Sequence, residues 1–258
     1  MIVQDVYNWI DHFAPFASQE GFDNAGLLVG APDWEVLGIH TAMDVTDSVL
    51  DEAEAAGANL IITHHPMMFG ARKTMREDDF EGRLLCRMIR ARIALIAVHT
   101  NLDQAPGGIN EVLAKTCGLS AVTGEGYLRA GSLPEGLTLT SLVTLLERVL
   151  HTTIRVMGQA TPDKVLHRMA VASGAGSDFW EDAHAMGAEV FLSGEIKHHH
   201  ALAMNGCGMI GLEAGHFATE EPGIFALADA LQNHLNAVQC DVCVSKSRLG
   251  AYALPSDC

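Results

Sequence analysis

Apolar residues along the chain recur at two spacings, one typical of helices and one typical of buried strands. Val3, Val6, Ile10 and Phe13 fall on one face of a helix, so residues 3–16 are predicted to form an amphipathic helix. Farther along, short apolar runs and helical periods alternate. The expected strands are residues 36–42, 60–63 and 93–98, and the expected helices run from Thr46 to Gly57 and over residues 80–91. This alternation predicts an α/β fold with a mainly parallel sheet.

The second half of the chain repeats this order. Strands are expected over residues 169–173, 189–192 and 209–212, and helices over residues 139–150 and 177–186, before a last helix and strand. The phrase AAGANLIITHH, residues 55–65, parallels AMGAEVFLSGE, residues 185–195. We interpret the parallel as an internal duplication, although any α/β unit that ends a helix with glycine gives part of the match. The glycine-rich segment 118–136 then divides two similar α/β halves, residues 1–125 and residues 126–258.

Composition and charge narrow the class of protein. The chain has 258 residues, 48% of them hydrophobic, which is enough for one large domain or two smaller ones with proper cores. Its apolar runs are too short to span a bilayer, and the N-terminal residues lack the features of a secretion signal, so a cytoplasmic protein without membrane contact is expected. The net charge of −16 opposes sequence-independent binding to phosphate backbones, so a nucleic acid polymer is a disfavoured partner.

The six cysteines are scattered and are expected to be reduced thiols. Cys240 and Cys243 alone have the spacing of metal ligands. Residues 238–243 also alternate as a strand would, and one such pair without a second is weak support for zinc, so a structural role is favoured.

Histidines and carboxylates follow three of the predicted strands, at the strand ends where open α/β sheets bind ligands. His64 and His65 come directly after one strand. Neighbouring residues of a continuing strand point to opposite faces, so both can serve one site only if the strand ends there, and Pro66 favours such an ending. An exposed histidine pair at the start of a loop is the alternative.

The other two groups follow later strands. His99 and Asp103 come after residues 93–98. His99 could bind a metal ion or orient another ligand, and Asp103 offers a carboxylate, although Asp103 alone is also typical of a helix cap or turn. His216 and Glu220 come after residues 209–212, where Thr219 is expected to cap a helix with Pro222 in its first turn. There Glu220 would by default only complement the helix dipole.

Taken together, three imidazoles and two carboxylates form the ligand set of a two-metal site between the two halves, at the carboxyl ends of their strands. The predicted ligands are His64, His65, Asp103, His216 and Glu220. They hold two divalent ions per subunit, and zinc, iron and manganese all suit such mixed ligands. Glu195, His198 and His199 follow another strand and are placed near the site, or alternatively at a solvated helix start.

These motifs resemble those of the NIF-three-like family, whose members are often labelled GTP cyclohydrolase 1 type 2 homologues. The shared phrases span nearly the whole chain, in the family's order, and are FDNAGLLVG (residues 22–30), MDVT (43–46), THHP (63–66), HTNLD (99–103), SGEIKHH (193–199) and GHFATE (215–220). The resemblance is to the short form without an inserted middle domain, and Phe22 stands where tryptophan is common in the family.

The resemblance implies a two-part α/β fold, a toroidal homohexamer, and metal ligands at the five positions given above. With the residues, it favours a metal-dependent hydrolase that acts on a small nucleotide-like or phosphate-bearing molecule. Glu220 is the expected bridging carboxylate, and His99 and Glu195 are the expected catalytic groups that move protons. The alternative is a non-catalytic metal-binding protein or regulatory partner, although five ligands shared by two ions leave open positions and favour catalysis.

Overall fold

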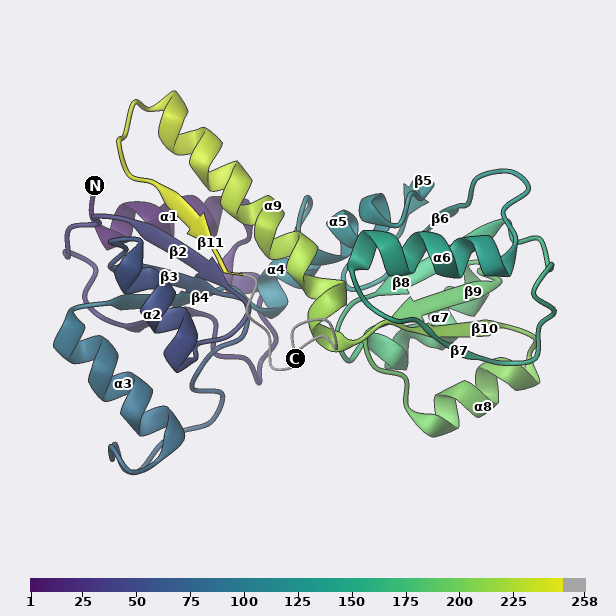
Figure 1. Cartoon of the computed structure of the whole chain (residues 1–258), viewed down its shortest axis with the longest axis horizontal. Helices are drawn as coiled ribbons and strands as arrows, with labels where there is room; N and C mark the ends of the chain where they lie inside the picture. Colours follow the sequence, from purple (N-terminus) through teal and green to yellow (C-terminus); the bar gives the residue numbers. More distant parts are fainter. Residues whose placement is uncertain (248–258) are drawn as a thin grey trace. The chain divides into compact units, whose positions relative to one another are not determined.

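The computed structural model describes residues 1–247; residues 248–258, with Cys258, lie outside the described part. The fold is mixed α/β with two sheets (Figure 1). By its contacts the described chain forms two compact units, one of residues 1–106 and 224–247 and one of residues 107–223. These units differ from the predicted halves, 1–125 and 126–258, which are inferred from a repeated sequence pattern and not from contacts. The internal duplication remains a prediction.

The first unit holds a five-stranded sheet in the order β1-β4-β3-β2-β11. Its elements are α1 (Val3–Phe13), a 3-10 turn (Phe16–Ser18), β1 (Gly26–Val29), β2 (Ile39–Ala42), α2 (Asp47–Ala55), β3 (Leu60–Thr63), α3 (Phe80–Ala91), β4 (Ala94–Ala97), α4 (Thr100–Gln104) and β11 (Val244–Lys246). The last helix, α9 (His216–Ala237), begins in the second unit and ends in the first.

The second unit holds a six-stranded sheet in the order β5-β6-β8-β9-β10-β7. Its elements are α5 (Ile109–Thr116), β5 (Ser120–Thr123), β6 (Arg129–Ser132), α6 (Leu139–Leu150), β7 (Arg155–Met157), β8 (Arg168–Ala172), a 3-10 turn (Gly176–Phe179), α7 (Trp180–Ala185), β9 (Val190–Ser193), α8 (His198–Gly206) and β10 (Ile210–Glu213).

The prediction of mainly parallel sheets is wrong, because both sheets are mixed. In the first sheet β2, β3, β4 and β11 pair in parallel, but the edge strand β1 is antiparallel to β4. In the second, only the β8–β9 and β9–β10 pairs are parallel, while β5, β6 and β7 add antiparallel pairs. The strands β5 and β7 are largely exposed, so they lack the apolar runs that predicted the central strands.

The central strands and their helices form as their sequences indicate. The strand 60–63 and the helices 80–91 and 139–150 are confirmed with the predicted bounds. Thr46 caps α2, since its side chain accepts a hydrogen bond from the amide of Val49 at 3.2 Å. Asp79 caps α3 in the same way, through the amide of Gly82 at 2.7 Å.

The start of α9 differs from its prediction. The helix begins at His216, so Thr219 and Pro222 lie inside it instead of at its cap and first turn. Thr219 Oγ1 donates back to the carbonyl oxygens of Gly215 and His216, at 3.2 and 2.8 Å. A hydroxyl that bonds to the preceding turn does not cap the helix, which is why the capping signal misleads here.

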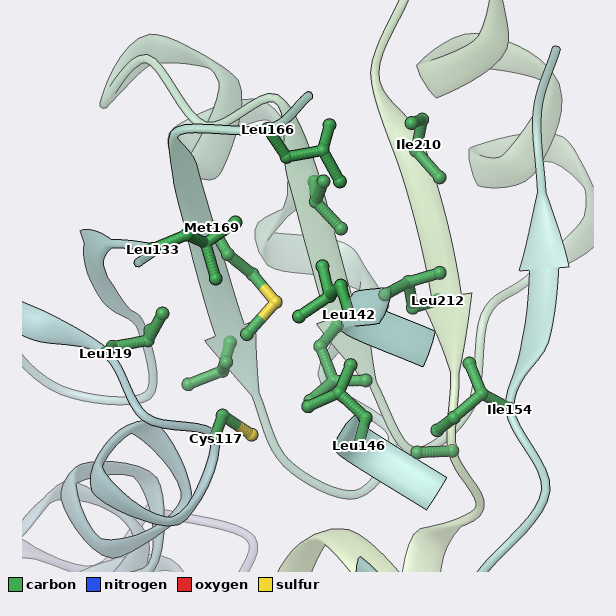
Figure 2. Packing of buried hydrophobic residues seen from close by; sticks show 14 of the residues in the cluster. Cys117, Leu119, Leu133, Leu142, Leu146, Ile154, Leu166, Met169, Ile210 and Leu212 are labelled. Carbon is green, nitrogen blue, oxygen red and sulfur yellow. The ribbon is translucent and has the colours of Figure 1, made fainter. Parts of the chain in front are cut away.

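Leucine-rich packing fills one face of the second sheet (Figure 2). Leu142 and Leu146 of α6 pack with Met169 of β8 and Leu212 of β10, and all four side chains are fully buried. The other face holds Phe191, which is fully buried in a separate cluster with residues of α7 and α8. Alternate residues of β9 therefore enter different cores, as expected for a sheet covered on both faces.

The five described cysteines are free thiols. Cys117 is fully buried, and burial raises the pKa of its thiol to about 12, so it stays protonated and serves as a core residue. Cys240 and Cys243 lie in irregular chain before β11, so the strand predicted over residues 238–243 is wrong. Within residues 1–247, no helix combines the length and the apolar character that crossing a bilayer requires.

His40 is a buried ionisable group in β2, with 2% of its surface exposed. Its Nδ1 lies 2.8 Å from Ser245 Oγ, and its Nε2 lies 3.3 Å from a carboxylate oxygen of Glu52. Burial lowers the pKa of the imidazole below the ordinary value of 6.5, and Glu52 offsets only part of this effect. The fold therefore favours neutral His40.

Acid is expected to destabilise the protein partly through His40. Because the folded-state pKa lies below 6.5, the unfolded chain binds more protons as the pH falls below that value, and stability declines. Substitution His40→Gln is expected to lessen the fall of the urea midpoint between about pH 7 and 5. His167→Gln, at an exposed histidine, is the control. An equal fall in wild type and His40→Gln would contradict the assignment.

Candidate metal centre

The first candidate ligands lie at the end of β3. This strand ends at Thr63, whose hydroxyl donates to the carbonyl of His65 at 2.8 Å and holds a tight turn. The turn lets neighbouring histidines approach each other, and the ring centroids of His64 and His65 are 4.9 Å apart. His64 is fully buried and His65 is half-buried, so the alternative of an exposed pair does not hold.

His99 joins this pair from the end of β4. Its ring centroid lies 5.1 Å from that of His64 and 5.7 Å from that of His65. One nitrogen from each of the three rings lies within 4.8 Å of the other two, close enough for one ion. Of the roles that the sequence allows for His99, this geometry fits that of a metal ligand.

The three imidazoles are oriented in the same way. Each Nδ1 lies within hydrogen-bond distance of an oxygen atom that can accept its proton. The pairs are His64 with the Val98 carbonyl at 2.9 Å, His65 with Asp44 Oδ1 at 2.8 Å, and His99 with Asp23 Oδ1 at 2.8 Å. A proton held at Nδ1 leaves the lone pair on Nε2, which is the state of metal-binding imidazoles. The residues therefore fit a divalent ion.

Asp23 is the most strongly held of these acceptors. Its side chain is fully buried and accepts hydrogen bonds from the amide and the hydroxyl of Thr100 as well as from His99. Burial by itself raises the pKa of the carboxyl, but the bonds from Thr100 and His99 outweigh it and hold the pKa below 3.8. Asp23 is thus an anion that fixes the ring of His99.

The pKa of His99 is itself lowered, first by burial and then by the neighbouring His64, although Asp23 opposes the shift. A neutral imidazole is the form that binds a metal ion. Asp103, in α4, adds a carboxylate to the group. Its Oδ1 lies 3.6 Å from His64 Nε2, and only 6% of the residue is exposed.

The second unit contributes a smaller set at the start of α9. His216 and Glu220 are one helical turn apart, and His216 Nε2 lies 3.2 Å from Glu220 Oε2. Glu220 is 4% exposed, so it does more than complement the helix dipole at the surface. His216 Nδ1 lies 2.8 Å from Glu195 Oε1, which repeats the pattern of the first unit.

Glycine is required at position 174 to leave room for this set. Gly174 has φ +53°, and a Cβ atom there would lie 2.1 Å from Glu220 Oε1 and 3.1 Å from His216 Nε2. Its amide donates to Thr219 Oγ1 at 3.0 Å, so the same loop also holds the first turn of α9. The close approach of this loop fixes the position of the Glu220 carboxylate.

Substitution Gly174→Ala is expected to lower both stability and bound metal, because the added methyl group displaces Glu220. Gly187→Ala is a matched control, since Gly187 has φ +79° but its Cβ would meet only Arg168 Cδ at 3.9 Å. Both variants should lose about 1–2 kcal/mol from the left-handed backbone, but only Gly174→Ala should lose metal. Elemental analysis and urea unfolding measure the two effects. Equal metal content in the two variants would refute the role of Gly174.

The predicted neighbours of the site divide into two groups. Glu195 contacts His216, as described above, and borders a cleft of about 470 Å³ that is also lined by Lys197, Glu213 and His216. His198 and His199 lie in the first turn of α8. In the part of the chain that the structure describes, no group of three potential ligands includes either of them.

The structure thus brings His64, His65, Asp103 and His99 together in the first unit, and His216, Glu220 and Glu195 in the second. Sequence reasoning missed the orienting roles of Asp23 and Asp44. Each is the acidic residue of a shared phrase, FDNAGLLVG or MDVT, and an acidic residue in such a phrase is the signal that could have identified them.

A family model described as Duf34/NIF3 (NGG1p interacting factor 3) matches residues 1–249. The chain belongs to the Duf34/NIF3 family. Its curated relatives in this family include proteins named GTP cyclohydrolase 1 type 2 homolog. The one from Clostridium acetobutylicum is 32% identical over 97% of each chain, and the one from Clostridium perfringens is 32% identical over 92% of this chain and 94% of its own.

A solved structure of similar fold supports the architecture. The chain resembles a hypothetical protein of Staphylococcus aureus with a TM-score of 0.92 and 27% identity, over 98% of this chain and 99% of that one. The two chains therefore share a mixed α/β fold over nearly their whole length.

Proposed function

We propose that this Duf34/NIF3 protein holds two divalent metal ions and acts as a hydrolase on a small nucleotide-like or phosphate-bearing molecule. The observation that carries the proposal is the common orientation of four imidazoles. His64, His65, His99 and His216 each place Nδ1 against an oxygen atom. In addition, Nε2 of His64 lies 3.6 Å from Asp103 Oδ1 and Nε2 of His216 lies 3.2 Å from Glu220 Oε2, so carboxylates lie on the side of the ring where a metal ion would bind.

The proposed ligands of the dinuclear centre are His64, His65, Asp103, His216 and Glu220. The shared phrases THHP, HTNLD and GHFATE carry all five residues, which supports this set. When bound, divalent ions of this kind lower the pKa of water and stabilise negative charge on a reacting group. Mixed imidazole and carboxylate ligands suit zinc, iron and manganese.

The remaining groups of the site are assigned by their contacts. His99 is the proposed proton acceptor, because Asp23 holds its ring and burial keeps it neutral. Glu195 is proposed as a positioning residue, since its carboxylate accepts the proton of His216 Nδ1 and fixes that ring. The cleft beside His216 gives a small molecule room to reach the site.

The test is a hydrolysis assay on a panel of nucleotides, phosphoesters and cyclic amides, with the protein stripped by a chelator and reloaded with zinc, iron or manganese. We expect turnover of at least one class by the reloaded protein and its loss in Asp103→Asn. Glu181→Gln, at an exposed glutamate, should behave as wild type. Bound metal without turnover of any member would favour the alternative, a non-catalytic metal-binding or regulatory protein.

The resemblance also supports a homohexamer as the proposed assembly. Light scattering on purified protein should then give about six times the chain mass of 27.6 kDa. A monomer or dimer at micromolar concentration would contradict it.

A further inference from the structure

Two phenylalanines stand exposed beside the histidines of the first unit. Phe22 is 64% exposed and Phe69 is 53% exposed. Their ring centroids are 6.1 Å apart with 44° between the planes, and the Phe69 ring lies 6.0 Å from the His99 ring, edge to face at 80°. An aromatic pair thus borders the candidate metal ligands on a surface open to solvent.

The chain holds both rings in place through their neighbours. Phe22 precedes Asp23, whose buried carboxylate is fixed by His99 and Thr100. Phe69 follows Met68, whose carbonyl accepts a hydrogen bond of 2.6 Å from Asn24 Nδ2. The loops that carry the two rings are therefore joined to each other and to the histidine cluster. Such anchoring keeps the rings at the site.

A single exposed apolar side chain is ordinary, but two neighbouring exposed aromatic rings form a patch of the kind that marks a binding site. Phe80, which is 57% exposed, lies at the start of α3, and the guanidinium carbon of Arg83 lies over its ring at 5.8 Å from the centroid. Phe22 contacts Phe69 instead, and Phe69 also contacts His99. An occupant of these rings would lie directly against the histidine cluster, which suits a small molecule that reacts there.

We propose that Phe22 and Phe69 form an aromatic wall that binds the planar heteroaromatic ring of the substrate, with its polar part directed to His64, His65 and His99. The inference rests on the proposed function and names its substrate class. Every heteroaromatic base has a π face, so stacking on phenylalanine gives affinity for a ring without selecting one base. The wall therefore predicts tolerance among bases and discrimination against compounds without a ring.

The probes are GMP, CMP and ribose 5-phosphate, titrated by calorimetry into the full-length protein as purified, with metal content measured in parallel. Wild type should bind GMP and CMP similarly and both more tightly than ribose 5-phosphate. Phe22→Leu and Phe69→Leu should each weaken both nucleotides by about 5- to 100-fold and leave ribose 5-phosphate unchanged. Phe80→Leu, the matched exposed control, should change neither.

Equal affinity for GMP and ribose 5-phosphate, or nucleotide affinities unchanged in both wall variants, would overturn the inference. Variants that change the mass in light scattering but not nucleotide affinity would assign the rings to an interface between copies, and would also overturn it. Failure of the proposed function would give a different result. If the protein contains no metal but still binds nucleotides more tightly than ribose 5-phosphate, the metal centre is contradicted and the aromatic wall is supported.

Discussion

Substitution His64→Ala is expected to weaken zinc binding more than 100-fold, the largest effect of any single change at the site. Loss of groups that only orient a ligand costs about 10- to 100-fold in metal affinity, and loss of the ligand itself costs more. His64 is fully buried, and its Nδ1 is held by the Val98 carbonyl. Competition with a chromophoric chelator measures the affinity.

Two variants control this measurement. Asp44→Asn removes the carboxylate that orients His65, and the zinc affinity of this variant should fall by about 10- to 100-fold. His167→Ala removes an exposed imidazole and should bind zinc as wild type does. Zinc affinity in His64→Ala within threefold of wild type would exclude His64 as a ligand.

Substitution Phe191→Ala is expected to lower the free energy of unfolding by about 3–5 kcal/mol. Phe191 in β9 is fully buried in a cluster with Ala183 of α7 and Met204 of α8. Truncation of its side chain therefore leaves a cavity that the surrounding residues fill only in part. Urea denaturation followed by circular dichroism measures the change. Leu202 lies on α8 and is 60% exposed, so Leu202→Ala should change the free energy of unfolding by less than about 0.5 kcal/mol. Equal midpoints for the two variants would contradict the assignment of this core.

The central strands and long helices could be predicted from the sequence because local signals agree there. Residues 60–63 are a continuous apolar run, and Asp79 caps the helix that follows at residues 80–91. The strand at residues 120–123 gives no such signal, since its side chains are largely exposed and its pairing with β6 decides its conformation. The antiparallel edges of both sheets were therefore beyond prediction.

The candidate ligands could be predicted because each follows a strand. The orientation of their imidazole rings could not be predicted from the sequence. Asp23 and His99 are 76 residues apart, and Glu195 and His216 are 21 apart, so these pairs depend on how the strands and loops fold together. The role of His99 beside His64 has the same origin, because the two histidines end different strands that pair in the sheet.

The most direct test of the proposed dinuclear centre is elemental analysis of untagged protein with His65→Ala and Glu220→Ala variants. We expect about two ions per chain in wild type, as in a two-metal site, and a clear loss in both variants. Glu181→Ala should keep the wild-type content. Wild-type metal content in both His65→Ala and Glu220→Ala would contradict the account.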